Sequence, residues 1–117
     1  MAKVIFFEKP GCRNNTRQKA VLELSGNTVE ALSILDYPWT KEELSLYLGL
    51  KPVRECFNPS APAVKSGDVD PDNYIREQAI EMMASDPILI RRPLMKIGNR
   101  HLQGFDMAEL RKIISLA

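Results

Sequence analysis

The sequence predicts an α/β fold with a mixed four-stranded sheet, built as strand–helix–strand, a helical insertion, a β-hairpin and a last helix. Two observations predict it. A short apolar block at residues 4–7 is followed by a helical pattern and a second apolar segment, which is typical of a βαβ unit. Near the other end, Gly98-Asn99 lies between two short segments with strand character, which indicates a hairpin. A chain of 117 residues is expected to form one domain.

The first three elements follow from apolar spacing and turn residues. The first strand is expected at residues 4–7, since a short apolar run bounded by charges is typical of a strand buried on both faces. Pro10-Gly11 ends it and turns the chain. A helix is predicted over residues 12–25, and most of residues 27–36 is predicted as a second strand. A connecting helix makes these two strands parallel.

The middle of the chain predicts short helices separated by proline-rich turns. Thr40 and Glu43 have the spacing of a capping box. Asp70-Pro71 is expected to open a long helix. The predicted elements are a helix over residues 40–48, a short helix over 52–57, an ordered loop over 58–73 and a helix over 72–84.

The C-terminal part predicts the hairpin and one more helix. Residues 94–97 and 100–103 are the two strands, and Asp106 is expected to cap a helix that runs to Leu116. The resulting order of elements is that of a thioredoxin-like fold. Its core comprises residues 1–36 and 86–117, and residues 37–85 form the helical insertion.

Composition excludes several classes of function. Sixteen basic and fifteen acidic residues leave a net charge of +1, so bulk charge predicts no nucleic-acid or membrane partner. No apolar run approaches membrane-spanning length, and the N-terminus shows no signal-peptide pattern. Two cysteines in such a chain fit a reducing compartment, so we expect a cytoplasmic protein.

Cys12 is the strongest candidate for chemistry. It lies where the first strand turns into the first helix, so free backbone N–H groups of Arg13, Asn14 and Asn15 should favour a thiolate and an anion there. A thiolate is the nucleophilic form of cysteine. The alternative is an inert buried thiol. The Pro10-Gly11 turn and the polar residues that follow favour the reactive interpretation.

The other candidates are weaker. Cys56 is interpreted as a buried filler, because a Cys12–Cys56 disulfide needs Cα atoms within about 7 Å, which a sequence does not show. Without a Cys-x-x-Cys pair, a monothiol mechanism that uses glutathione fits better than a dithiol one. His101 is more typical of a surface histidine than of a Cys–His pair. No spacing of acids, cysteines and histidine predicts a metal site.

Three motifs resemble the arsenate reductase (ArsC) family of thioredoxin-fold proteins, which also includes the Spx-type regulators. They are Pro10-Gly11-Cys12, residues 87–93 and Leu102-Gln103-Gly104-Phe105. Within the family the chain most resembles the nitrogenase-associated branch. That resemblance is carried by Glu8-Lys9-Pro10-Gly11-Cys12, Asn14-Asn15, Phe57-Asn58-Pro59 and Val64-Lys65-Ser66-Gly67.

The resemblance implies a covalent mechanism and an anion site. In the reductases the cysteine matching Cys12 attacks arsenate, and glutathione and glutaredoxin resolve the adduct. Three arginines hold the oxyanion there, of which Arg92 matches one, whereas Asn58 and Gln103 stand at the other two positions. These departures weaken arsenate reduction but leave the thiol site intact. The resemblance also implies a cis Arg92–Pro93 peptide bond close to Cys12.

Two functions are therefore expected from the sequence. The first is a monothiol, glutathione-linked thiol oxidoreductase resembling arsenate reductase. Cys12 would be its nucleophile, Arg92 would hold an anionic group, and glutathione or glutaredoxin would be a reaction partner, with no bound cofactor. The second is a binding module for a protein partner in nitrogen fixation, with Cys12 either silent or a redox sensor.

Overall fold

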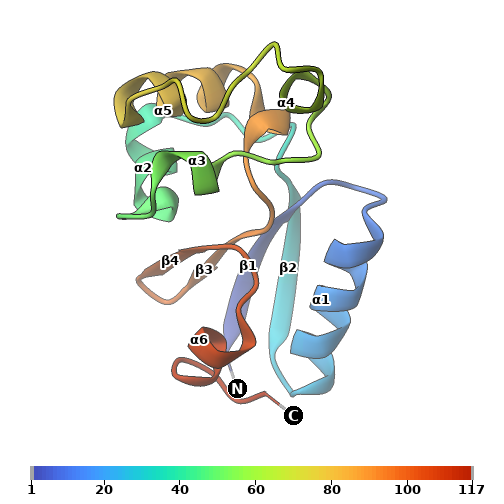
Figure 1. Ribbon diagram of the computed structural model, residues 1–117. Coiled ribbons are helices and arrows are strands. Elements are labelled where there is room, and N and C mark those ends of the chain that lie inside the picture. The colour runs from blue at the N-terminus through green and yellow to red at the C-terminus, as the bar shows by residue number, and fades with distance from the viewer. Residues whose placement is uncertain (1, 117) are drawn as a thin grey trace.

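The computed structural model describes residues 2–116 and contains a mixed four-stranded sheet. The strands are β1 (Lys3–Glu8), β2 (Thr28–Ser33), β3 (Leu94–Ile97) and β4 (Arg100–Gln103). Their order across the sheet is β2-β1-β3-β4 (Figure 1). The β1–β2 pair is parallel, and the β1–β3 and β3–β4 pairs are antiparallel. The predicted fold class is confirmed.

The helices form two groups. They are α1 (Arg13–Leu24), α2 (Lys41–Leu48), α3 (Val53–Cys56), α4 (Pro62–Ser66), α5 (Arg76–Ser85), the 3₁₀ helix η1 (Pro87–Leu89) and α6 (Met107–Arg111). Figure 1 shows α2 to α5 gathered beyond one end of the sheet, while α1 and α6 lie alongside it. None of the helices described in residues 2–116 has the length and apolar character needed to cross a bilayer.

The sheet separates two apolar cores, and β1 contributes to both because successive side chains of a strand point to opposite faces. Val4 and Phe6 pack with Leu22 of α1 and with Leu110 of α6 on one face. Phe7 packs on the other face, against Trp39 and the helices of the insertion. The central strand is thereby fixed from both sides, and so is the turn that follows it.

The insertion begins at a well-defined helix start. The Thr40 hydroxyl accepts a hydrogen bond from the backbone N–H of Glu43 at 3.1 Å. The Glu43 side chain does not complete the predicted capping box; it accepts a hydrogen bond from the Tyr37 hydroxyl at 2.6 Å. Gly49 ends α2 with φ of 55°, in the region that side-chain-bearing residues avoid.

Three predicted boundaries are wrong. Helix α5 begins at Arg76, because the Asp70 carboxylate accepts a hydrogen bond from the N–H of Asp72 and holds a turn instead of opening the helix. The predicted loop over residues 58–73 contains a short helix, with Pro62 in the first turn of α4. The last helix ends at Arg111 and gives way to turns.

Candidate functional site

Cys12 is the N-cap residue of α1, as the turn pattern indicates. Gly11 precedes it with φ of 83°, which lets the backbone reverse direction. The Cys12 N–H donates to the Lys9 carbonyl at 3.1 Å, and the Cys12 carbonyl accepts from the Thr16 N–H at 3.0 Å. The sulfur therefore sits at the start of a helix, on a turn whose own hydrogen bonds are satisfied.

The Asn15 side chain holds this turn in place and is only 2% exposed. Its Oδ1 accepts from the Lys9 N–H at 3.1 Å, and its Nδ2 donates to Gln18 Oε1 at 3.0 Å. The Asn15 side chain thus bonds within the loop, and it is the backbone N–H of Asn15 that acts on the Cys12 sulfur. Sequence reasoning named the amide of Asn15 but missed the positioning role of its side chain.

Arg92 faces Cys12 from the segment that enters β3. The Arg92–Pro93 peptide bond is cis, as the resemblance implied. The Arg92 side chain lowers the pKa of the Cys12 thiol by hydrogen bonding and by its charge. Its Nε and Nη1 atoms are buried and have no hydrogen-bond partner in the described chain. Arg92 also lines the cavity at Cys12, so its guanidinium is placed to bind an anionic group of a ligand there.

The electrostatic environment favours the thiolate. Burial by itself raises the pKa of Cys12, but this effect is outweighed by hydrogen bonds from the Asn15 N–H, the Arg92 guanidinium and the Asn14 N–H, together with the charge of Arg92. The pKa of Cys12 consequently lies below its ordinary value. A larger fraction of thiolate at neutral pH is the property expected of a nucleophilic cysteine.

A polar cavity of about 160 Å³ opens onto the half-buried Cys12. Residues from three segments line it, among them Cys12, Asn14, Asn15, Asn58, Arg91 and Arg92. Lys9 and Arg13 are exposed and do not line it. The cavity therefore admits a small polar group to the sulfur beside the partly buried Arg92. The sequence pointed to Arg92 but not to Arg91, which also lies in the cavity wall.

The resemblance implies arginines at two positions that hold amides here, Asn58 and Gln103. Both side chains are 6% exposed and form hydrogen bonds with the backbone. Asn58 Nδ2 donates to the Ile88 carbonyl at 3.2 Å, and Asn58 Oδ1 accepts from the Ser60 N–H at 3.0 Å. Gln103 Nε2 donates to the carbonyls of Cys56 and Arg91, both at 3.1 Å. These side chains therefore shape the site but add no positive charge to it, so the cations that line the cavity are Arg91 and Arg92.

The remaining candidates lie outside this cavity. Cys56 is 1% exposed, its thiol donates to the Pro52 carbonyl at 3.6 Å, and burial raises its pKa. Both cysteines are free thiols. The His101 ring packs edge-on against Tyr47, with centroids 4.8 Å apart, and does not line the Cys12 cavity. Residues 2–116 contain no cluster of acids, cysteines and histidine that could hold a metal ion.

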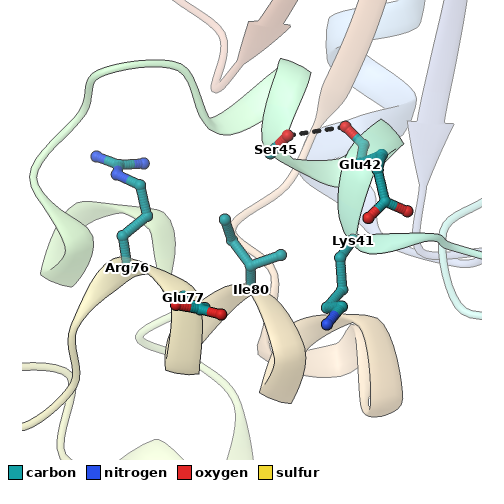
Figure 2. Close-up of a pocket in the computed structure, with 6 residues that line it drawn as sticks. All are labelled: Lys41, Glu42, Ser45, Arg76, Glu77 and Ile80. Atoms are coloured by element: carbon teal, nitrogen blue, oxygen red, sulfur yellow. Dashed lines mark hydrogen bonds between the residues drawn. The ribbon is translucent and has the colours of Figure 1, made fainter.

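A groove of about 440 Å³ between α2 and α5 is larger but offers no comparable chemistry (Figure 2). Its walls carry Lys41 and Glu42 on one side and Arg76 and Glu77 on the other. Its hydroxyl group, on Ser45, donates to the Glu42 carbonyl at 2.8 Å. The groove has no activated nucleophile, so the Cys12 cavity is the better candidate for a reactive site.

Comparison with known proteins decides the family. The sequence matches the ArsC family over residues 10–113, which is most of the chain. The protein belongs to the ArsC family. Its Cys12 turn and the Arg92–Pro93 segment lie within the matched region, so the family assignment covers the candidate site.

Individual ArsC relatives agree with this assignment. An uncharacterized 15.7 kDa protein in the draG 3′ region of Rhodospirillum rubrum is 53% identical over 116 residues, covering 99% of this chain and 81% of the relative. That relative fits the nitrogenase-associated branch. A crystal structure of an ArsC family related protein from Bacteroides fragilis has a TM-score of 0.82 at 27% identity, covering 96% and 99% of the two chains. An arsenate reductase from Vibrio cholerae has a TM-score of 0.78 at 22% identity, covering 97% and 98%.

Proposed function

We propose that this ArsC family protein is a monothiol, glutathione-linked thiol oxidoreductase with Cys12 as its nucleophile. Family membership supports thiol oxidoreductase chemistry in general. The observation that carries the finer proposal is the lowered pKa of Cys12, which results from Arg92 and from N–H groups at the start of α1. The same residue lines an open polar cavity.

The proposed reaction is thiol–disulfide exchange. The Cys12 thiolate attacks one sulfur of a disulfide, the sulfur–sulfur bond of that substrate breaks, and a mixed disulfide forms on Cys12. The departing thiolate takes a proton from water. The thiolate of a glutathione molecule then attacks the substrate-derived sulfur of the mixed disulfide, forms a new disulfide with it and releases the Cys12 thiolate. The second thiol comes from solution because Cys56 is buried and its pKa is raised.

Arsenate is the less favoured substrate. A doubly charged oxyanion needs several donors, and arginine is the side chain suited to supply them in pairs. Here two of the three positions hold amides that already bond to backbone carbonyls. One guanidinium matches a single carboxylate or a leaving thiolate better than it matches arsenate.

Mass spectrometry of three proteins tests the proposal. After incubation with oxidised glutathione, wild type and the Cys56→Ala variant should each gain one glutathione, and Cys12→Ser should gain none. Subsequent reduced glutathione should restore the free thiol. Incubation with arsenate and glutathione should leave no arsenic adduct. Modification of Cys12→Ser, or no modification of wild type, would show that Cys12 is not the nucleophile.

The amides at Asn58 and Gln103 also favour a second candidate, a redox-sensing module that binds a protein partner. Such a module would accept a glutathione on Cys12 without turning over. Steady-state reduction of a small disulfide by glutathione separates the two, because an oxidoreductase accelerates that reaction and a sensor does not.

A further inference from the structure

The buried Asn15 amide fixes the orientation of a neighbouring side chain, that of Gln18. Asn15 Oδ1 accepts a hydrogen bond from the backbone N–H of Lys9 at 3.1 Å, and a backbone N–H can only donate. The Nδ2 group of the same amide therefore faces Gln18 and donates to its Oε1 at 3.0 Å. Asn15 is 2% exposed, so the protein itself supplies the partners that hold both amides in one orientation.

This arrangement leaves the donor group of Gln18 free. A Gln18 amide turned over would place its N–H groups against those of Asn15, two donors with no acceptor between them. In the described residues 2–116, Gln18 Nε2 has no hydrogen-bond partner. Gln18 is half-buried and lines the Cys12 cavity. Its two N–H bonds are therefore available to a molecule that reaches the sulfur of Cys12.

The charges around the cavity favour one kind of ligand group. Arg91 and Arg92 line it, and within residues 2–116 no carboxylate does. An oxygen with lone pairs can accept hydrogen bonds from Gln18 and is attracted by the two guanidinium groups. An ammonium group has only donors to offer, and the same two cations repel it.

We infer that Gln18 is a substrate-binding residue, whose amide N–H donates to an acceptor oxygen carried by the part of the disulfide that becomes bonded to Cys12. The inference rests on the proposed function. When Cys12 attacks, its new sulfur–sulfur bond holds that part of the substrate in the cavity, while the other half leaves as a thiolate. Gln18 therefore selects disulfides with a carboxylate close to the sulfur over disulfides with an ammonium there, without transferring a proton or an electron.

Two small disulfides of similar length test this selection. Dithiodipropionate carries carboxylates, which only accept hydrogen bonds, and cystamine carries ammonium groups, which only donate. The variants are Gln18→Met, which removes the N–H donor without adding charge, and Gln18→Glu, which keeps an acceptor for Asn15 but presents a second carboxylate oxygen to the cavity. The same replacements at the exposed Gln78 are matched controls, because Gln78 lies on α5 and does not line the Cys12 cavity. Mass spectrometry of acid-quenched samples gives the rate of mixed-disulfide formation on Cys12, and the ratio of the two rates cancels the thiolate fraction of Cys12.

The ratio of the dithiodipropionate rate to the cystamine rate should fall about fivefold in Gln18→Met, fall further in Gln18→Glu, and stay at the wild-type level in both Gln78 variants. An unchanged ratio in Gln18→Met, or an equal fall in the Gln78 variants, would overturn the inference and leave the proposed function standing. No mixed disulfide of wild type with either probe would overturn both. Circular dichroism establishes that each variant is folded, and if Gln18→Met does not fold, an unchanged ratio in Gln18→Glu would overturn the inference.

Discussion

At the scale of single residues, the Cys12–Arg92 contact decides what this protein can do. The sulfur is stabilised as a thiolate by two backbone N–H groups and one guanidinium, against the opposing effect of burial. The backbone contribution belongs to any residue at that helix start. The guanidinium contribution depends on a side chain eighty residues away in the sequence, so it can be removed separately.

Replacing Arg92 by glutamine should raise the pKa of Cys12 and slow its alkylation by iodoacetamide at pH 7 by up to about tenfold. The sign follows from the thiolate being the reactive form. Wild-type alkylation should rise as pH increases through the lowered pKa and then level off. In Arg92→Gln that rise should move to higher pH. The measurement is the alkylation rate across a pH series.

The control for this variant is Arg13→Gln, which removes an exposed charge beside Cys12 but does not alter the lining of its cavity. Exposed charges contribute little in salt, so its profile should coincide with that of wild type. Equal shifts in both variants would mean that general charge, rather than the Arg92 contact, sets the reactivity of Cys12.

At the scale of elements, strand register brings the two halves of the site together. Phe7 of β1 pairs with Leu94 of β3, so the chain leaving β1 toward Cys12 runs beside the chain that enters β3 from Arg92. Gln103 at the end of β4 then joins α3 to the Arg91 carbonyl. The position of Arg92 therefore depends on three elements held by one buried amide.

Replacing Gln103 by methionine should lower the free energy of unfolding by about 1–3 kcal/mol, because the Arg91 carbonyl loses its donor and the Cys56 carbonyl keeps only the Arg91 N–H. Arg92 should also lose its fixed position, which moves the pH profile of Cys12 alkylation upward. Urea unfolding and the alkylation series measure the two effects.

Gln78→Met is the comparison for the Gln103 variant. Gln78 is exposed and accepts one hydrogen bond from the Ile75 N–H at the start of α5. Its loss should cost at most about 1 kcal/mol and leave the alkylation profile unchanged. A Gln103→Met protein that is as stable and as reactive as wild type would show that the Gln103 hydrogen bonds do not hold Arg92 in position.

At the scale of the whole molecule, the inner strand β1 links the two apolar cores, because neighbouring residues of this strand pack on opposite faces of the sheet. Phe6 is fully buried on the α1 and α6 face, and Phe7 is 2% exposed on the face of the insertion. The single tryptophan, Trp39, lies beside Phe7 with ring centroids 4.8 Å apart. Its fluorescence therefore reports on one face only.

Phe6→Ala should destabilise the protein by about 3–5 kcal/mol, and the Trp39 fluorescence should reveal the whole loss although Phe6 lies on the opposite face. Cooperative unfolding gives the same urea midpoint by fluorescence and by circular dichroism. Leu50→Ala, at a fully exposed position, should leave the midpoint unchanged. Separate midpoints for the two signals would mean that the two faces unfold independently.

The sequence by itself determined the features that are local. The apolar run of β1, the Pro10-Gly11 turn and the Gly98-Asn99 hairpin each depend on neighbouring residues, so the elements and the place of Cys12 could be predicted. The start of α5 could not be predicted, because the Asp70 side chain accepts a hydrogen bond that holds a turn and does not cap the helix.

Only the tertiary structure decided the environment of the sulfur. Arg92 acts on Cys12, and Gln103 bonds to the carbonyls of Cys56 and Arg91. These contacts join segments that are far apart in the chain and depend on strand register and burial. The type of a residue limits which hydrogen bonds it can form, and the packing around it determines which of them it does form.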